Sequence, residues 1–177
     1  MRKSYISNIV KAMPDSGIKD FFDVANSLDG ALSLGVGEPD FATPEYIRDV
    51  AIDSIRRADT KYTDNRGTAE LRRAVAEYLE KFDLHYNGED GILITMGASE
   101  GIDLALRTLV DPGDEVLVTE PCYVSYEPCV ELCGGIPVAL NTKESDAFRL
   151  TASGLMEKIT DKTKAIMISF PNNPTGA

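Results

Sequence analysis

The stretch 92–109, ILITMGASEGIDLALRTL, constrains the fold of this chain more than any other. Residues 92–94 form an uninterrupted apolar run, which is typical of a short strand buried on both faces. Three small residues follow as a predicted turn, and residues 102–109 then carry apolar side chains at helical spacing. The stretch therefore predicts a strand, a tight turn and an amphipathic helix.

Such a junction is a natural anion site, because the first turn of a helix has unpaired N–H groups and the positive end of the helix dipole. Most strand–turn–helix junctions nevertheless bind nothing. The acidic Glu100 and Asp103 suit the dipole but would not help to hold a phosphate. The binding interpretation therefore depends on what lies next to the turn.

The net charge of -11 argues against nucleic acid or an anionic membrane as the main partner, since both require a basic face. No apolar run approaches the length of a membrane span, and the first ten residues lack a signal-peptide core. We therefore expect a cytoplasmic protein with one substantial core, and no membrane association.

The three cysteines do not indicate a metal site or a disulfide framework. Cys129 and Cys133 lie four residues apart on a predicted helix, but the single histidine, His85, is distant and no second cysteine pair exists. Buried thiols are the better interpretation, and no metal is expected.

Helical and strand patterns alternate along the rest of the chain. We predict an extended arm over 1–14, a helix over 16–28, a helix that Thr43 caps and Pro44 opens, a helix that Thr68 caps, strands over 115–119, 136–140 and 165–170, and a short helix that Thr151 caps. This alternation indicates an α/β fold with a mostly parallel sheet covered by helices.

In an open α/β sheet, ligands bind beyond the carboxyl ends of the strands. Three of the predicted strands end in residues with binding chemistry: the small turn of Gly97, Ala98 and Ser99, the aromatic ring of Tyr123, and the amides of 172–173 between two prolines. An anion cradle, a stacking ring and an amide donor together predict a pocket for a phosphorylated, planar ligand. By contrast, Gly35 and Gly37 make a weak dinucleotide motif, since no third glycine follows.

Five segments, in order, resemble one known family. The segments GVGEPDFATP, KYTDNRGTAELRRAVAEYL, ITMGASEGIDLAL, DPGDEVLVTEPCYVSYEP and SFPNNPTGA are similar to those of fold-type I pyridoxal-phosphate (PLP) aminotransferases of class I/II, the aspartate, alanine and aromatic enzymes. The likeness covers nearly the whole chain, and PNNPTG is its most specific motif. It implies transfer of an amino group between an L-amino acid and a 2-oxo acid, with PLP as cofactor.

The resemblance implies a role for each cofactor-binding residue. Gly97, Ala98 and Ser99 would bind the phosphate, Tyr123 would stack on the pyridine ring, and Asn173 would donate to its phenolic oxygen.

The resemblance implies two further contacts. Gly37 would lie against the substrate carboxylate, and Tyr62 would reach the phosphate held by the neighbouring subunit. The active unit would then be a homodimer.

The lysine that forms the Schiff base with PLP follows NNPTG in that family. Lys158, Lys162 and Lys164 precede a predicted strand rather than follow one, so they are poor substitutes. We therefore expect the chain to be an N-terminal portion that is inactive alone. Residues 1–44 would be the arm and a small-domain segment, and 45–177 the first part of the PLP-binding large domain.

Three alternatives stay open. A PLP-dependent β-lyase or a carbon–carbon cleaving enzyme would share all of these motifs. A ligand-sensing regulator could use the same domain without catalysis, although no helix-turn-helix or basic region precedes the arm. A methyltransferase-like domain would instead use LGVGEPD as the loop for a sulfonium cofactor and would not bind PLP.

Overall fold

A computed structural model describes residues 5–14, 24, 27–28, 30, 37 and 39–177. The chain divides into two compact units, one made of residues 1–16 and 96–177 and the other of residues 17–95. The predicted helix over 16–28 and the Gly35 part of the glycine loop lie outside the described residues, apart from isolated positions. Each unit has its own packing and is described separately.

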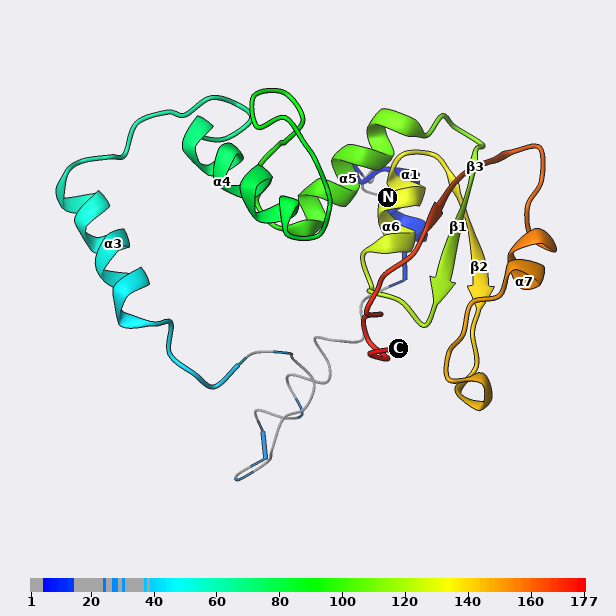
Figure 1. Cartoon of the computed structure of the whole chain (residues 1–177). Coiled ribbons are helices and arrows are strands. Elements are labelled where there is room, and N and C mark those ends of the chain that lie inside the picture. The colour runs from blue at the N-terminus through cyan, green and yellow to red at the C-terminus, as the bar shows by residue number, and fades with distance from the viewer. Residues whose placement is uncertain (1–4, 15–23, 25–26, 29, 31–36, 38) are drawn as a thin grey trace. The chain divides into compact units, whose positions relative to one another are not determined.

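A three-stranded parallel sheet forms the centre of the first unit (Figure 1). Its strands are β1 (Glu115–Glu120), β2 (Ile136–Asn141) and β3 (Thr163–Met167), in the order β2-β1-β3. The parallel α/β prediction is therefore confirmed. The third strand begins and ends earlier than the predicted 165–170, because its pairing with β1 stops at Met167.

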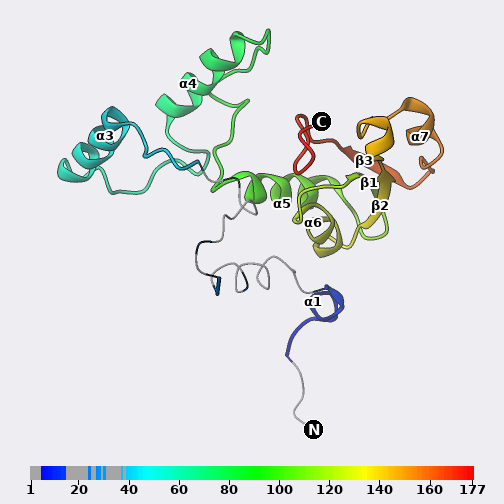
Figure 2. The same cartoon turned by 90° about the horizontal axis from the view of Figure 1, so that it is seen from below.

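Two helices pack on β1 to make the core of this unit. They are α5 (Ala98–Leu109) and α6 (Tyr126–Leu132), which lie on the same side of the sheet in Figure 2. The core consists of residues from both helices, from the β1 strand and from the turn before it: Leu106, Val110, Val116, Val118, Cys129 and Val130. Val110 is buried where the helical pattern had placed Leu109, which is 54% exposed, because α5 ends at Leu109 and the chain turns inward there.

Short helices complete the first unit. The helix α1 (Asn8–Ala12) replaces part of the predicted extended arm, since the hydroxyl of Ser7 accepts a hydrogen bond from the Val10 N–H and caps it. A 3-10 turn covers Glu144–Asp146. The helix α7 (Ala152–Met156) begins as predicted, with the Thr151 hydroxyl accepting from the Gly154 N–H.

The second unit contains α3 (Glu45–Arg56) and α4 (Ala69–Glu80). Thr68 caps α4 as predicted, its hydroxyl accepting from the Leu71 N–H at 3.3 Å. The prediction for α3 was wrong by one position: Pro44 occupies the cap and no side chain caps the helix.

The apolar stripe on α3 does not face a core in this chain. Ile47, Val50 and Ile55 are 46%, 66% and 69% exposed, and none of the residues of α3 is buried. The amphipathic pattern correctly predicted a helix, but helical periodicity does not supply the surface that must cover its apolar face.

The predicted strand over 92–94 does not form. These residues run as irregular chain, and the Ile94 N–H donates to the Arg66 carbonyl in a polar loop at 3.0 Å. A strand requires a neighbouring strand to satisfy its backbone groups, and none of the three strands of the described sheet pairs with this segment. Within the described part of the chain, no helix is long and apolar enough to cross a membrane.

Replacement of a β1 side chain tests the central position of this strand. Leu117 has no exposed surface, so we expect Leu117→Ala to lower the free energy of unfolding by about 2–5 kcal/mol through lost burial and a residual cavity. Urea unfolding measures the loss. Leu109→Ala, at an exposed position, is the matched control and should cost about 1 kcal/mol or less. Equal losses for the two variants would contradict the buried central position of β1.

Candidate functional site

The N-terminus of α5 is built as an open cradle. Gly97 caps the helix at φ 89°, a conformation that favours glycine, and a Cβ added there would meet nothing within 4 Å. The helix begins at Ala98, so Ala98 and Ser99 lie in its first turn rather than in the predicted turn before it. Their N–H groups have no acceptor within the helix. The Glu100 carboxylate accepts a hydrogen bond from the Met96 N–H, which draws it toward the preceding residue.

Ser99 and Tyr123 meet directly, although 24 positions separate them in the sequence. Their hydroxyl oxygens lie 3.3 Å apart, and the Tyr123 ring makes an edge contact with Tyr126 at 5.7 Å between centroids. Hydrogen bonds with the hydroxyls of Ser125 and Ser99, in that order, lower the pKa of Tyr123. The structure thus brings two of the predicted cofactor residues together at one end of α5.

The C-terminal loop is tied to the same region by Asn172. Its side-chain amide donates to the Pro121 carbonyl at 3.0 Å, just beyond the end of β1. This contact follows from topology, because β3 is the parallel neighbour of β1 and their carboxyl ends share one edge. Two backbone hydrogen bonds, Asn172 N–H to the Ala177 carbonyl and Gly176 N–H to the Asn172 carbonyl, close the loop at 2.8 Å each.

Asn172 also carries an acceptor that the described residues leave unused. Its Oδ1 atom is buried and has no hydrogen-bond partner among them. The neighbouring Asn173 is exposed, and its backbone N–H donates to the Ser169 hydroxyl at 3.4 Å. A buried acceptor without a partner is costly, so this edge of the sheet has a hydrogen-bond acceptor for which the described residues supply no donor.

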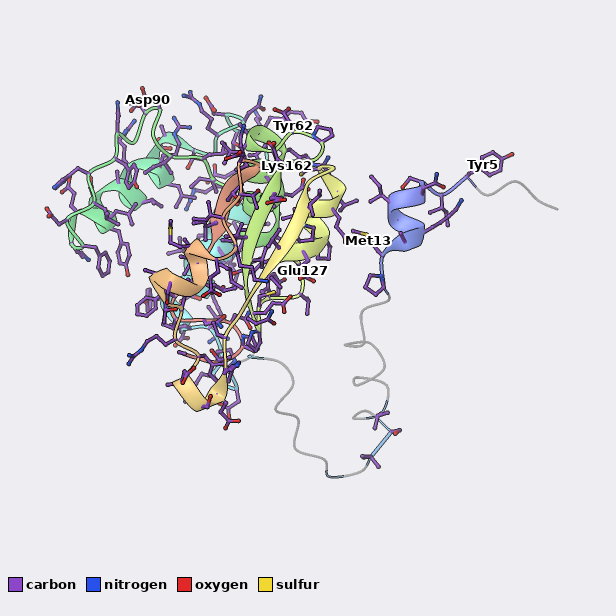
Figure 3. The ribbon with its side chains drawn as sticks, turned by 90° about the vertical axis from the view of Figure 1, so that its right-hand side faces the viewer. Tyr5, Met13, Tyr62, Asp90, Glu127 and Lys162 are labelled. Carbon is purple, nitrogen blue, oxygen red and sulfur yellow. The ribbon has the colours of Figure 1, made fainter. Side chains whose placement is uncertain are left out.

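The other two predicted site residues, Gly37 and Tyr62, belong to the second unit. Gly37 is exposed, and a Cβ added to it would meet nothing within 4 Å. The Tyr62 side chain, labelled in Figure 3, is fully exposed on a polar loop.

A pair of carboxyl groups flanks the Tyr123 loop. Glu120 ends β1, and Glu127 lies in the first turn of α6 (labelled in Figure 3). A hydrogen bond with Glu120 raises the pKa of Glu127, and burial and the negative charges of Glu120 and Glu131 act in the same direction.

A pocket opens between the carboxyl ends of β1 and β2. It is lined by Glu120, Pro121, Cys122, Asn141 and Thr142. None of these five residues belongs to the predicted cofactor site, so the pocket and the Ser99–Tyr123 pair are neighbouring but separate features.

The cysteines have the properties of structural thiols. Cys129 is buried, and Cys122 and Cys133 are half-buried. Burial is the main cause that raises the pKa of all three thiols, which favours the neutral form over the metal-binding thiolate.

Sequence reasoning missed two residues, one in each unit. Ser125, whose hydroxyl bonds to Tyr123, lies in the segment DPGDEVLVTEPCYVSYEP, where only Tyr123 was assigned a role. Arg72 is buried on α4, and its signal was available: it occupies the inward face of the helix together with Ala76.

Removal of the Ser99 hydroxyl tests the Ser99–Tyr123 contact. We expect Ser99→Ala to raise the pKa of Tyr123 toward 10, because the phenolate loses one hydrogen-bond donor. Ultraviolet titration measures the change, and Tyr123→Phe identifies which transition belongs to this tyrosine. Ser153→Ala, on α7, is the control and should leave the transition in place. An unchanged midpoint in Ser99→Ala would contradict the contact.

Comparison with known proteins finds relatives over nearly the whole chain. The chain is 45% identical over 175 residues to a putative aminotransferase, YugH, of Bacillus subtilis, covering 98% of this chain and 45% of that protein. It is 42% identical to aromatic-amino-acid aminotransferase 2 of Thermococcus litoralis, covering 97% and 44%. A solved structure of a Thermus thermophilus aspartate aminotransferase mutant superposes with a TM-score of 0.90 at 35% identity, covering 100% of this chain and 47% of that one.

The chain thus spans about half the length of the relatives it matches. The sequence model of the family described as "Aminotransferase class I and II" matches residues 29–177. Because this match covers most of the sequence, and the solved relative shares its fold, the chain belongs to the class I and II aminotransferase family.

Proposed function

We propose that the protein to which this chain belongs is a PLP-dependent aminotransferase that moves an amino group between an L-amino acid and a 2-oxo acid. The observation that supports this most directly is the Ser99–Tyr123 contact at the open N-terminus of α5. It puts an anion cradle and an aromatic ring next to each other, as a phosphorylated ring requires. Membership of the aminotransferase family agrees with this chemistry.

The residues present fit the phosphate and ring of PLP. The cradle has glycine at a positive φ that other residues rarely adopt, two first-turn N–H groups and the exposed hydroxyl of Ser99. A phosphate at a helix N-terminus is stabilised by those N–H groups and by the helix dipole. The unpartnered Oδ1 of Asn172 shows that the same edge has unused polar capacity.

PLP, when bound, supplies the electron sink that stabilises negative charge on the substrate carbon. The chain's own residues would bind and orient it. Gly97, Ala98 and Ser99 would hold the phosphate, and Tyr123 would keep the ring flat by stacking. Asn173 would donate to the phenolic oxygen and stabilise its negative charge.

Substrate and subunit contacts complete the proposal. Gly37 would let the substrate carboxylate approach the backbone. Tyr62 would contact the phosphate bound by the neighbouring subunit, which makes the functional unit a cytoplasmic homodimer. The Tyr62 side chain is fully exposed, so its ring is available for such a contact. This chain matches about half the length of its relatives. The Schiff-base lysine would come from the half that it does not match.

The first experiment determines cofactor and reaction class in the whole protein. PLP is added, its visible absorption is recorded, and an amino acid donor is supplied with a panel of 2-oxo acids that includes aspartate-derived and aromatic members. A new amino acid from one oxo acid supports the proposal. Elimination of a β-substituent without amino transfer would assign a β-lyase, and absence of PLP binding would contradict the cofactor assignment.

The Asn173 side chain gives a residue-level test. We expect Asn173→Ala to raise the pH midpoint of the bound cofactor's visible absorption band and to weaken PLP binding about tenfold, because a donor to a charged oxygen is worth about 1.5–3 kcal/mol. Asn141→Ala, at the neighbouring strand end, is the matched control and should change neither quantity. An unshifted absorption titration in Asn173→Ala would refute the assigned role.

A further inference from the structure

Arg72 is the only buried charged side chain among the described residues, with 2% of its surface exposed. Burying a cation is costly unless its donors are satisfied. Two of these donors bind backbone rather than carboxylate: Nε donates to the Gly88 carbonyl at 3.0 Å and a terminal nitrogen donates to the Gly67 carbonyl at 2.6 Å. A carboxylate oxygen of Asp64 lies 3.6 Å away. Arg72 therefore joins two loops that are far apart in sequence.

The first of these loops, 61–67, is held at several points in its second half, residues 64–67. Asp64 accepts hydrogen bonds from the Arg66 backbone N–H at 2.8 Å and from the Arg66 guanidinium at 3.1 Å. These bonds lower the pKa of Asp64 to about 2. The Asp64 carboxylate is therefore charged at any pH near neutrality. The stability that it gives to the loop is fully present above about pH 4 and is lost as the pH falls toward 2.

The second segment, 88–94, is bound to the same loop independently of Arg72. The Arg66 guanidinium donates to the Glu89 carbonyl at 2.9 Å, and the Arg66 carbonyl accepts from the Ile94 N–H at 3.0 Å. Gly67, at φ 92°, fits closely against Ile94, where a Cβ would come within 2.5 Å of the isoleucine side chain. Loop 61–67, segment 88–94 and the start of α4 are therefore joined by hydrogen bonds into one body. Figure 1 shows the two loops next to α4.

Tyr62 projects from this body, two residues before Asp64, and its side chain is fully exposed. A side chain that must contact a ligand outside its own unit pays less ordering entropy when its backbone is already fixed. We propose that Arg72 is a positioning residue for Tyr62: it holds loop 61–67 so that the tyrosine is presented in one place to the cofactor phosphate of a neighbouring subunit. This inference rests on the role proposed above for Tyr62.

Arginine suits this task better than lysine. Its planar fork reaches the Gly67 and Gly88 carbonyls at the same time, whereas a lysine ammonium keeps the charge but cannot hold both carbonyls in fixed directions. Arg72→Lys thus removes the simultaneous hydrogen bonds to the two carbonyls without removing the positive charge.

The test is a double-mutant cycle in the whole, PLP-loaded protein, with the PLP dissociation constant as the readout. We expect Tyr62→Phe and Arg72→Lys each to weaken PLP binding about tenfold, consistent with loss of one hydrogen bond to a charged group. The double variant should bind no more weakly than Tyr62→Phe alone, because the arginine acts through the tyrosine. Arg73→Lys, at an exposed position that pairs with Glu89 at 3.3 Å, is the matched control and should have no effect.

Hydrogen exchange and a second variant separate positioning from general stability. Exchange in peptides covering 61–67 should accelerate in Arg72→Lys while β1 stays protected. Asp64→Asn loosens the same loop at an exposed position and leaves both backbone hydrogen bonds of the Arg72 guanidinium in place, so it replaces Arg72→Lys in the cycle if that variant does not fold. It should show the same non-additivity with Tyr62→Phe.

The outcomes are distinguishable. Full additivity of the two substitutions, or unchanged PLP affinity in the loop variants while Tyr62→Phe weakens binding, would overturn the positioning role and leave the proposed function standing. Unchanged affinity in Tyr62→Phe would instead refute the role of Tyr62 at the phosphate, and the inference for Arg72 with it.

Discussion

The burial of β1 is the constraint on which the first unit depends. Val116, Leu117 and Val118 have no exposed surface, and the strand is hydrogen-bonded in parallel to β2 on one side and β3 on the other. The centre of a strand enclosed in this way is apolar, and the one buried polar side chain of β1, Thr119, donates its hydroxyl to the Met167 carbonyl at 3.4 Å. Its two parallel neighbours in turn bring three chain segments to one edge, which is where the candidate site lies.

The site depends on two contacts that this arrangement makes possible. The Asn172 amide holds the C-terminal loop against the Pro121 carbonyl, and the Ser99 hydroxyl meets Tyr123 at the start of α5. Neither contact is buried enough to contribute greatly to folding. Their effect is to fix the directions of groups that would bind a phosphorylated ring, and preorganisation of that kind is how a binding site gains affinity. In the second unit, Arg72 binds the Gly67 and Gly88 carbonyls, and we propose that it has the corresponding effect on the loop that carries Tyr62.

Several elements could be predicted from local patterns, and the failures have a common cause. The apolar run in β1 and the cap of α4 depend on neighbours in sequence, so they were predicted correctly. The run 92–94 has the same composition as a strand but lacks a strand to pair with in the described sheet, and the stripe on α3 lacks a covering surface. Both predictions required knowledge of a partner, which a local pattern does not contain.

The sequence by itself determined the fold class, which follows from periodicity and turn residues, and the family, which follows from the resemblance of its motifs and their order. It also proposed the candidate site residues. Only the tertiary structure decided which of those residues meet. It placed the Ser99 hydroxyl on Tyr123, assigned the Pro121 contact to Asn172 rather than to Asn173, and gave Arg72 two backbone carbonyls from different loops. The physical reason is that a hydrogen bond between distant segments depends on sheet order and helix placement, which are properties of the packed chain and not of any one stretch of it.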